Sequence, residues 1–272
     1  MAESIIRFEH VSLAFDDVQA LDDVSFDLPA GETRIILGAA GSGKTVLMKT
    51  ALGLNRPDLG KVFLFGQEIT ALPEKKLFAL RAKVGMLFQE SALFDSLTIA
   101  ENVAYPLENQ AAVKCPAAEV GTRVEEALRN VELPHTLDKY PNELSGGMRR
   151  RVGIARANVT APALVFYDSP TAGLDPITAN NIMALLIKQR DLRHTTTVMT
   201  SHRLQDGALL ANYRWNDQAG RIERATSGEE QSDVRTRFMV MHEGRLVFEG
   251  TEEDMEASGD PYVSKFVLRA SA

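Results

Sequence analysis

A glycine-rich run near the start of the chain has the residue types and spacing of a phosphate-binding loop. The run matches G-x-x-x-x-G-K-[ST] between a predicted strand and a predicted helix, a context that argues against an ordinary glycine turn. Glycines let successive N–H groups curl around phosphate oxygens, and the helix adds its N-terminal dipole. Lys44 is predicted to reach the β- and γ-phosphates of a nucleotide, and Thr45 to bind Mg²⁺. The loop comprises Gly38, Ala39, Ala40, Gly41, Ser42, Gly43, Lys44 and Thr45.

A carboxylate at the end of an apolar run supplies a second part of such a site. Residues 164–167 are Leu, Val, Phe and Tyr, and Asp168 follows directly. In P-loop proteins an acid at this place holds Mg²⁺, usually through water. An aspartate at a strand end has no such role in most proteins, but downstream of a phosphate-binding loop the metal-binding interpretation is favoured. The sequence therefore predicts a Mg²⁺–nucleotide site.

The elements that must position these residues alternate between strands and helices. The N-terminal part has three short strand patterns, and a fourth strand leads directly into the loop. A helix follows the loop, and later strands alternate with a further helix, which predicts an α/β fold with a parallel sheet. The predicted strands are 5–8, 11–15, 21–28, 33–37, 62–65, 84–88, 164–167 and 196–200, and the predicted helices are 45–54 and 179–190.

Other segments differ in character from this alternation. Residues 98–157 are helical in pattern, with helices predicted at 119–130 and 145–156, and form an inserted helical subdomain. Residues 216–236 are polar and turn-rich and are interpreted as a surface insertion, within which residues 221–225 are placed to pair back as a hairpin. A second hairpin is predicted over residues 238–248. The expected division is one domain over residues 1–250 and a tail over 251–272.

Composition narrows the class of protein. The chain has 272 residues, 44% of them hydrophobic and 25% charged, which is typical of a globular protein with one large domain or two small ones. Its net charge of −7 argues against nucleic acid as a partner. A single cysteine, Cys115, excludes an internal disulfide and favours a reducing compartment. We expect neither a signal peptide nor a membrane span, so another chain would cross any membrane at which this protein acts.

The most specific pattern in the chain is Asn-Glu-Leu-Ser-Gly-Gly-Met-Arg-Arg-Arg at residues 142–151. Together with Asp-Ser-Pro-Thr-Ala-Gly-Leu-Asp at 168–175, it resembles the signature of ATP-binding cassette (ABC) ATPases. A capped helix with a flexible start is the less favoured alternative. Ser145 is predicted to cap the next helix, and Gly146 and Gly147 leave room for a phosphate at its N-terminus.

The resemblance to ABC ATPases carries implications for fold and assembly. It implies a P-loop NTPase cassette with a mixed sheet core, an N-terminal antiparallel β subdomain and an inserted helical subdomain. It also implies a head-to-tail homodimer that encloses ATP, in which the Leu-Ser-Gly-Gly motif completes the site of the opposite subunit. ATP and Mg²⁺ are the implied ligands.

Four further residues match the same family pattern. Gln89, after the predicted strand 84–88, resembles the Q-loop residue that contacts Mg²⁺ and the attacking water. Asp175 resembles the D-loop residue that couples the two sites of the dimer. His202 resembles the switch histidine that contacts the γ-phosphate, although a histidine after a strand would otherwise be unremarkable. Phe15 is placed like the aromatic residue that stacks on adenine, although a phenylalanine in a strand more often belongs to the core.

A narrower resemblance concerns one branch of the family. Residues 85–89, 92–98 and 101–107 resemble those of the phospholipid-transport ATPases of the Mla and Mce systems, and Met148 and residues 260–266 agree with that branch. The resemblance implies a peripheral protein on the cytoplasmic face of the inner membrane, which couples ATP binding and hydrolysis to phospholipid transport by a multi-pass permease. Importers of other substrates share most of these residues.

The sequence departs from the ABC pattern directly after Asp168. The family has a glutamate there as the base that polarises the attacking water, and this chain has Ser169, whose hydroxyl is a poor proton acceptor. General-base catalysis contributes about 10²–10⁴-fold, so hydrolysis is expected to be slow while ATP binding is retained. Two alternatives stay open. Either His202 or Glu90 substitutes for the base, or the change is an engineered trap or a sequence error.

Three functional classes follow from these features. The favoured class is the ATP-hydrolysing subunit of a membrane transporter. The second is a nucleotide-binding structural or regulatory subunit that dimerises on ATP without useful turnover, and Ser169 is its only support. The third is a soluble ABC ATPase of translation or DNA repair. Proteins of that class typically carry tandem cassettes or long coiled-coil insertions, and neither pattern occurs in this sequence.

Overall fold

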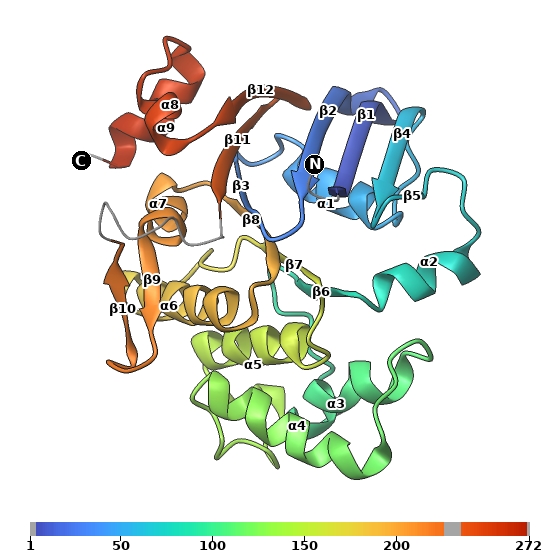
Figure 1. Ribbon diagram of the computed structural model, residues 1–272, viewed down its shortest axis with the longest axis vertical. Helices are drawn as coiled ribbons and strands as arrows, with labels where there is room; N and C mark the ends of the chain where they lie inside the picture. Colours follow the sequence, from blue (N-terminus) through green and yellow to red (C-terminus); the bar gives the residue numbers. More distant parts are fainter. Residues whose placement is uncertain (1–3, 226–234, 271–272) are drawn as a thin grey trace.

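The N-terminal part of the molecule is an antiparallel sheet, as predicted. The computed structural model describes the backbone of residues 4–225 and 235–270 (Figure 1). Two of the predicted strands, 5–8 and 11–15, are one strand in the structure, which continues through a bulge at His10 (φ 51°). The sheet has the order β2-β1-β4-β5 and consists of β1 (Ser4–Phe15), β2 (Val18–Pro29), β4 (Leu59–Leu64) and β5 (Gln67–Glu68).

A mixed sheet forms the centre of the fold. In the described residues its order is β12-β11-β3-β8-β7-β6, and only the edge strand β12 runs antiparallel to its neighbour. Every residue of β3, β7 and β8 is buried, as expected for parallel strands covered on both faces. The strands are β3 (Thr33–Leu37), β6 (Val84–Leu87), β7 (Leu164–Asp168), β8 (Thr196–Ser201), β11 (Thr236–His242) and β12 (Arg245–Gly250).

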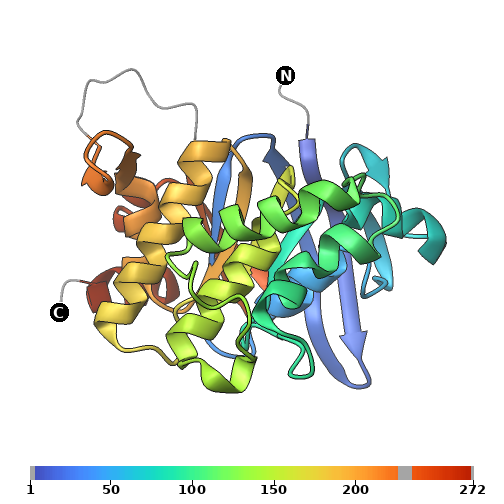
Figure 2. The ribbon, with the colours of Figure 1, turned by 90° about the horizontal axis from the view of Figure 1, so that it is seen from below.

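Helices surround this sheet and form a separate group at one end. Figures 1 and 2 show α3, α4 and α5 together at the end of the molecule away from the antiparallel sheet, where the helical subdomain was expected. The sequence did not predict α2, α7, α8 or α9. The first three are short, and α9 lies in the segment interpreted as a tail. The helices are α1 (Lys44–Ala51), α2 (Glu74–Arg81), α3 (Ile99–Asn109), α4 (Ala117–Asn130), α5 (Gly146–Asn158), α6 (Pro176–Arg193), α7 (Leu204–Asn212), α8 (Glu252–Glu256) and α9 (Pro261–Ala270).

The polar segment after α7 begins with a hairpin that packs on α6. Strands β9 (Tyr213–Asn216) and β10 (Arg221–Arg224) pair antiparallel, so the predicted hairpin is confirmed, although it starts before residue 216. Residues 226–234 of the predicted insertion lie outside the described residues. The second predicted hairpin is β11–β12. Among the described residues, none of the helices combines the length and apolar character that a membrane span requires.

Candidate nucleotide site

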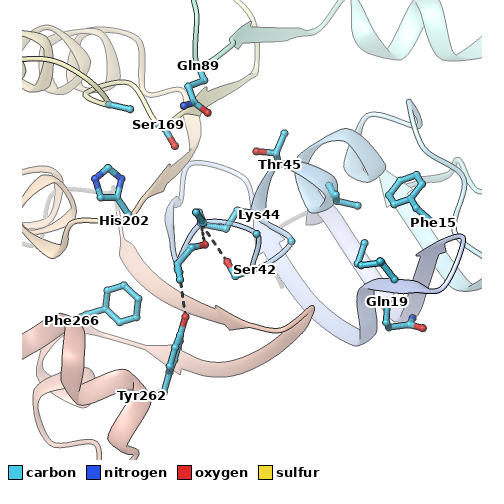
Figure 3. Close-up of a pocket in the computed structure, with 18 of the residues that line it drawn as sticks. Phe15, Gln19, Ser42, Lys44, Thr45, Gln89, Ser169, His202, Tyr262 and Phe266 are labelled. Carbon is cyan, nitrogen blue, oxygen red and sulfur yellow. Dashed lines mark hydrogen bonds between the residues drawn. The ribbon is translucent and has the colours of Figure 1, made fainter.

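Four segments that are far apart in the sequence meet at one edge of the mixed sheet. The phosphate-binding loop follows β3, Gln89 follows β6, Ser169 follows β7 and His202 follows β8. These strands are parallel, so their carboxyl ends lie at the same edge, where α/β proteins bind their ligands. Figure 3 shows the labelled side chains of Gln89, Lys44, Ser169 and His202 around one cleft.

Close packing around the phosphate-binding loop excludes a side chain at two of its glycines. Gly43, which precedes α1, has φ 99°, and a Cβ atom there would lie 2.5 Å from the carbonyl oxygen of Ala20. A Cβ atom on Gly38 would lie 2.3 Å from Ser42 Oγ. The loop therefore curls tightly at the N-terminus of α1, where backbone N–H groups and the helix dipole favour an anion. This arrangement fits the phosphates of a nucleotide.

Lys44 is buried beneath the loop and bonded to it. Its Nζ donates to the carbonyl oxygens of Gly38 and Ala39, each at 2.8 Å, and to Ser42 Oγ at 3.3 Å. Burial lowers the pKa of Lys44, and the carboxylate of Asp168 opposes this shift. Lys44 lines the cleft, and its contact with the β- and γ-phosphates stays a prediction.

Two of the three predicted metal-binding residues, Thr45 and Asp168, are hydrogen-bonded to each other. Asp168 is 4% exposed and accepts hydrogen bonds from Thr45 Oγ1 at 3.0 Å and Thr200 Oγ1 at 2.7 Å. Gln89 is exposed and lines the cleft. No cluster of three His, Cys, Asp or Glu side chains occurs in the described residues, so no protein cage for a metal is present there. Hydroxyl, amide and carboxylate oxygens fit Mg²⁺, which keeps waters and shares phosphate oxygens.

Ser169 lies beside this metal-binding pair with its backbone held in place. It has φ 47°, its N–H donates to Thr200 Oγ1 at 2.9 Å, and its Oγ lies 3.5 Å from Asp168 Oδ1. The side chain lines the cleft but brings no carboxylate to it. Of the two residues considered as a substitute base, His202 lines the cleft and Glu90 is not among the described residues that do.

A buried carboxylate fixes the segment around His202. Asp206 of α7 is 1% exposed and accepts hydrogen bonds from Thr171 Oγ1 at 2.7 Å and Ser201 Oγ at 2.9 Å. Ser201 Oγ in turn accepts from the N–H of Arg203 at 3.0 Å, and Arg203 Nη2 lies 3.6 Å from Asp206 Oδ1. Both neighbours of His202 are therefore tied to Asp206, together with the loop that follows Ser169. No pattern in the sequence predicted this network.

Replacing Asp206 by asparagine is expected to lower the free energy of unfolding by about 1–3 kcal/mol. The substitution keeps the size of the side chain but leaves buried hydroxyl groups without a charged acceptor. Urea denaturation of the full chain measures the effect. Asp138→Asn is the matched control, because Asp138 is exposed, and it is expected to change stability by less than about 0.5 kcal/mol. Equal stabilities of the two variants would contradict the prediction.

The cleft extends from these residues to Phe15. It has a volume of about 860 Å³, within the size range of small-molecule sites. Phe15 is 47% exposed and lines it with Val18, Gln19 and Ala20, so it is not a core residue. In Figure 3 Phe15 and Gln19 lie at the opposite side of the loop from His202. This position is compatible with the predicted stacking on adenine, which stays a prediction.

The signature motif and Asp175 lie outside the cleft of their own chain. Ser145 caps α5 by accepting the N–H of Met148 at 3.2 Å, as predicted, and Asp175 caps α6 by accepting the N–H of Thr178 at 3.0 Å. Hydrogen bonding from the Thr178 side chain, and then from its backbone N–H, lowers the pKa of Asp175. Ser145, Gly146 and Asp175 are exposed, and Gly147 packs against Thr178. The predicted contacts of these residues with nucleotide therefore require a second copy of the chain.

Three side chains that the sequence did not predict also line the cleft. Tyr262, Lys265 and Phe266 come from α9, in the segment interpreted as a tail. Residues 260–266 were noticed only as a branch-specific pattern. Tyr262 contacts the loop 223 residues away in the sequence, and the spacing of neighbouring residues cannot predict such a contact. A fourth unpredicted residue, Thr200, bonds Asp168 from the neighbouring strand.

Sequence comparisons agree with this geometry. The profile of the ABC transporter family matches residues 21–172. The methionine import ATP-binding protein MetN 2 of Rhodopseudomonas palustris is 36% identical over 98% of this chain, and MetN of Symbiobacterium thermophilum is 41% identical over 87%. The sulfate/thiosulfate import ATP-binding protein CysA of Mycolicibacterium paratuberculosis is 36% identical over 84%. The chain spans 64%, 69% and 60% of these relatives.

Solved structures show the same fold. An ATP-binding cassette in a dimeric post-hydrolysis state, bound to ADP and Pi, superposes with a TM-score of 0.75 at 26% identity, covering 90% of this chain and 98% of that one. CbiO1 from Clostridium perfringens, part of an ABC transporter complex, gives a TM-score of 0.77 at 26% identity over 98% of this chain and 94% of its own. ATP with Mg²⁺ is the ligand of this kind of cleft. The chain belongs to the ABC transporter family and has the fold of its ATP-binding cassette.

Proposed function

We propose that this chain is the ATP-hydrolysing subunit of an ABC importer. The observation that carries the proposal is that Lys44, Gln89 and His202 line one cleft at the carboxyl edge of the parallel strands. Thr45 also lines it and donates to the buried Asp168. The glycine loop, buried lysine and Thr45–Asp168 pair supply what binding of Mg²⁺–ATP requires. The import ATPases among its relatives support coupling of this site to transport.

A head-to-tail homodimer is part of the proposal. Ser145 and Asp175 cap two adjacent helices on an exposed surface, and neither lines the cleft of its own chain. Ile177, two residues after Asp175, is 76% exposed, although isoleucine is normally buried. A second chain placed over this surface would bury Ile177 and bring Ser145 to the other nucleotide. The dimeric cassettes of similar fold support the arrangement.

The partner of the dimer is proposed to be a multi-pass permease, with the chain peripheral on the cytoplasmic face of the membrane. A second groove, about 450 Å³ in volume, lies beside β6 and α3. Its walls expose Leu54 (48%), Phe94 (41%) and Tyr105 (39%), and Phe94 packs on Tyr105 with ring centroids 4.6 Å apart. Exposed apolar surface in a groove is typical of a protein–protein contact.

The transported substrate is proposed to be a small molecule, with methionine as the first candidate. The relatives named above import methionine or sulfate and thiosulfate. They lend no support to a phospholipid substrate. That expectation rests only on the resemblance of Met148 and residues 85–89, 92–98, 101–107 and 260–266. A non-hydrolysing regulatory subunit is the second candidate function, and Ser169 is the observation that favours it.

Two measurements test the proposal. Phosphate release by the purified full chain under single-turnover conditions, with Mg²⁺–ATP, distinguishes a slow ATPase from a subunit that only binds ATP. Recovery of a multi-pass membrane protein with the tagged chain from detergent-solubilised membranes tests the transporter assignment. Failure to bind ATP at millimolar concentration would contradict both candidate functions. Release of phosphate without any membrane partner would favour a soluble ATPase.

A further inference from the structure

The C-terminal helix α9 reaches the nucleotide cleft from the side opposite Phe15. Tyr262, Lys265 and Phe266 lie on it at the spacing of one helix face and all line the cleft. Figure 3 shows the Tyr262 hydroxyl pointing at the phosphate-binding loop and Phe266 beneath His202. A helix that follows the last strand of the sheet thus forms a wall of the site.

Tyr262 connects this helix to the loop by a hydrogen bond. Its hydroxyl accepts the N–H of Ala39 at 3.2 Å and lies 3.5 Å from the carbonyl oxygen of Met241, to which it donates. The ring stacks on His242, with centroids 3.8 Å apart and planes 20° apart, and meets Phe266 edge-on at 5.6 Å. Because the ring is held from two sides, its hydroxyl is a fixed support for the first turn of the loop.

Lys265 brings a positive charge to the same wall. Its Nζ lies 5.7 Å from the centroid of the Tyr262 ring, so the ammonium group stands beside the residue that contacts the loop. Within the described residues, no carboxylate forms an ion pair with Lys265. Phe266, only 8% exposed, anchors the helix against the core. Lys265 therefore adds a positive charge to the wall of the cleft from which Tyr262 contacts the phosphate-binding loop.

We propose that α9 is part of the nucleotide site, with Tyr262 as a positioning residue for the phosphate-binding loop and Lys265 as a contact for the nucleotide phosphates. The proposal rests on the proposed function only in requiring that the cleft bind a nucleotide. If Lys265 contacts the phosphates, its contribution to nucleotide affinity increases with the number of phosphates on the nucleotide. Tyr262 acts on the loop, so its contribution is the same for ATP and ADP.

Equilibrium titration of the full chain with ATP, ADP and AMP in the presence of Mg²⁺ tests this assignment. Lys265→Met is expected to weaken ATP binding about fivefold, ADP binding less and AMP binding little, because the charge interacts with each phosphate in a solvent-exposed setting. The effect is expected to shrink as KCl is raised. Tyr262→Phe, which removes one hydrogen bond and keeps the ring, is expected to weaken ATP and ADP about fivefold alike.

Matched controls are available elsewhere in the chain. Lys188→Met removes a lysine that also lies over an aromatic ring, 4.8 Å from the Trp215 centroid, but does not line the cleft. Tyr213→Phe removes a phenolic hydroxyl from a half-buried tyrosine outside the cleft. Neither control is expected to change any of the three dissociation constants. Thermal unfolding of every variant checks that the fold is retained.

Two results would overturn the proposal while the proposed function stands. If Lys265→Met and Lys188→Met bind ATP, ADP and AMP equally well, Lys265 is no phosphate contact. If Tyr262→Phe binds ATP as the unaltered chain does, Tyr262 does not position the loop. Loss of all nucleotide binding in the unaltered chain would instead contradict the proposed function, and the role of α9 with it.

Discussion

Ser169→Glu is expected to raise the single-turnover rate of ATP hydrolysis by about 10²–10⁴-fold, the usual contribution of a general base. The substituted side chain would project into the cleft beside Asp168, because the backbone of residue 169 is held by Thr200 through a 2.9 Å hydrogen bond. A carboxylate there can accept a proton from water, which the serine hydroxyl does poorly at neutral pH. Phosphate release in rapid-mixing experiments measures the rate.

Ser169→Gln is the control for this substitution, because glutamine has the size of glutamate without its charge. Its hydrolysis rate is expected to stay near that of the unaltered chain, and the dissociation constant for ATP is expected to be similar in all three proteins. Equal single-turnover rates for Ser169→Glu and the unaltered chain would show that the serine does not slow ATP hydrolysis. In that case His202 is the substitute base to examine, since it lines the same cleft.

Lys44→Met is expected to weaken ATP binding by at least about tenfold and to lower the hydrolysis rate further, by about 10²–10³-fold. Hydrogen bonds to charged groups contribute about 1.5–3 kcal/mol, and charge stabilisation in the transition state about 2.7–4 kcal/mol. The ammonium group is buried in the wall of the cleft among the loop carbonyls of Gly38 and Ala39. Lys44 is the one lysine in residues 38–45, so no neighbouring ammonium group of the loop can replace it.

The control for Lys44→Met lies on the same helix. Lys49 of α1 is partly exposed and does not line the cleft, so Lys49→Met makes the same change in net charge and is expected to leave ATP binding unchanged. Isothermal titration with ATP and a phosphate-release assay compare the two variants. Similar ATP affinities for both would mean that the loop does not bind the nucleotide as inferred. Thermal unfolding shows whether either variant has lost its fold.

The local parts of the fold and site were predictable because short-range rules specify them. Strand β3, the glycine loop and helix α1 follow from an apolar run, a run of glycines and a helical pattern in consecutive residues. The hairpins β9–β10 and β11–β12 follow from turn residues between complementary strands. Helices α2 and α7 were missed, because short helices that lie on a larger surface depend on packing more than on their own pattern.

Convergence of the site residues depended partly on the sequence and partly on the tertiary fold. The motifs predicted that Lys44, Asp168 and His202 would act together, and the parallel order β3-β8-β7 brings them to one edge. The motifs could not show that Thr200 and Thr45 both bond Asp168, since strand order decides which hydroxyl faces which carboxylate. The family resemblance, rather than the spacing alone, identified the ABC family, whereas the relatives do not support the narrower phospholipid branch that it suggested.

By itself, the sequence determined that this protein binds nucleotide phosphates, that it has an ABC signature and that Ser169 replaces the usual glutamate. Each of these features lies within a few consecutive residues, where spacing is enough to specify chemistry. Only the tertiary structure brought Tyr262 to Ala39, 223 residues away in the sequence, and placed Asp206 between two loops of the site. Such contacts arise because separate strands and helices pack around one core, and no local pattern records which of them will meet.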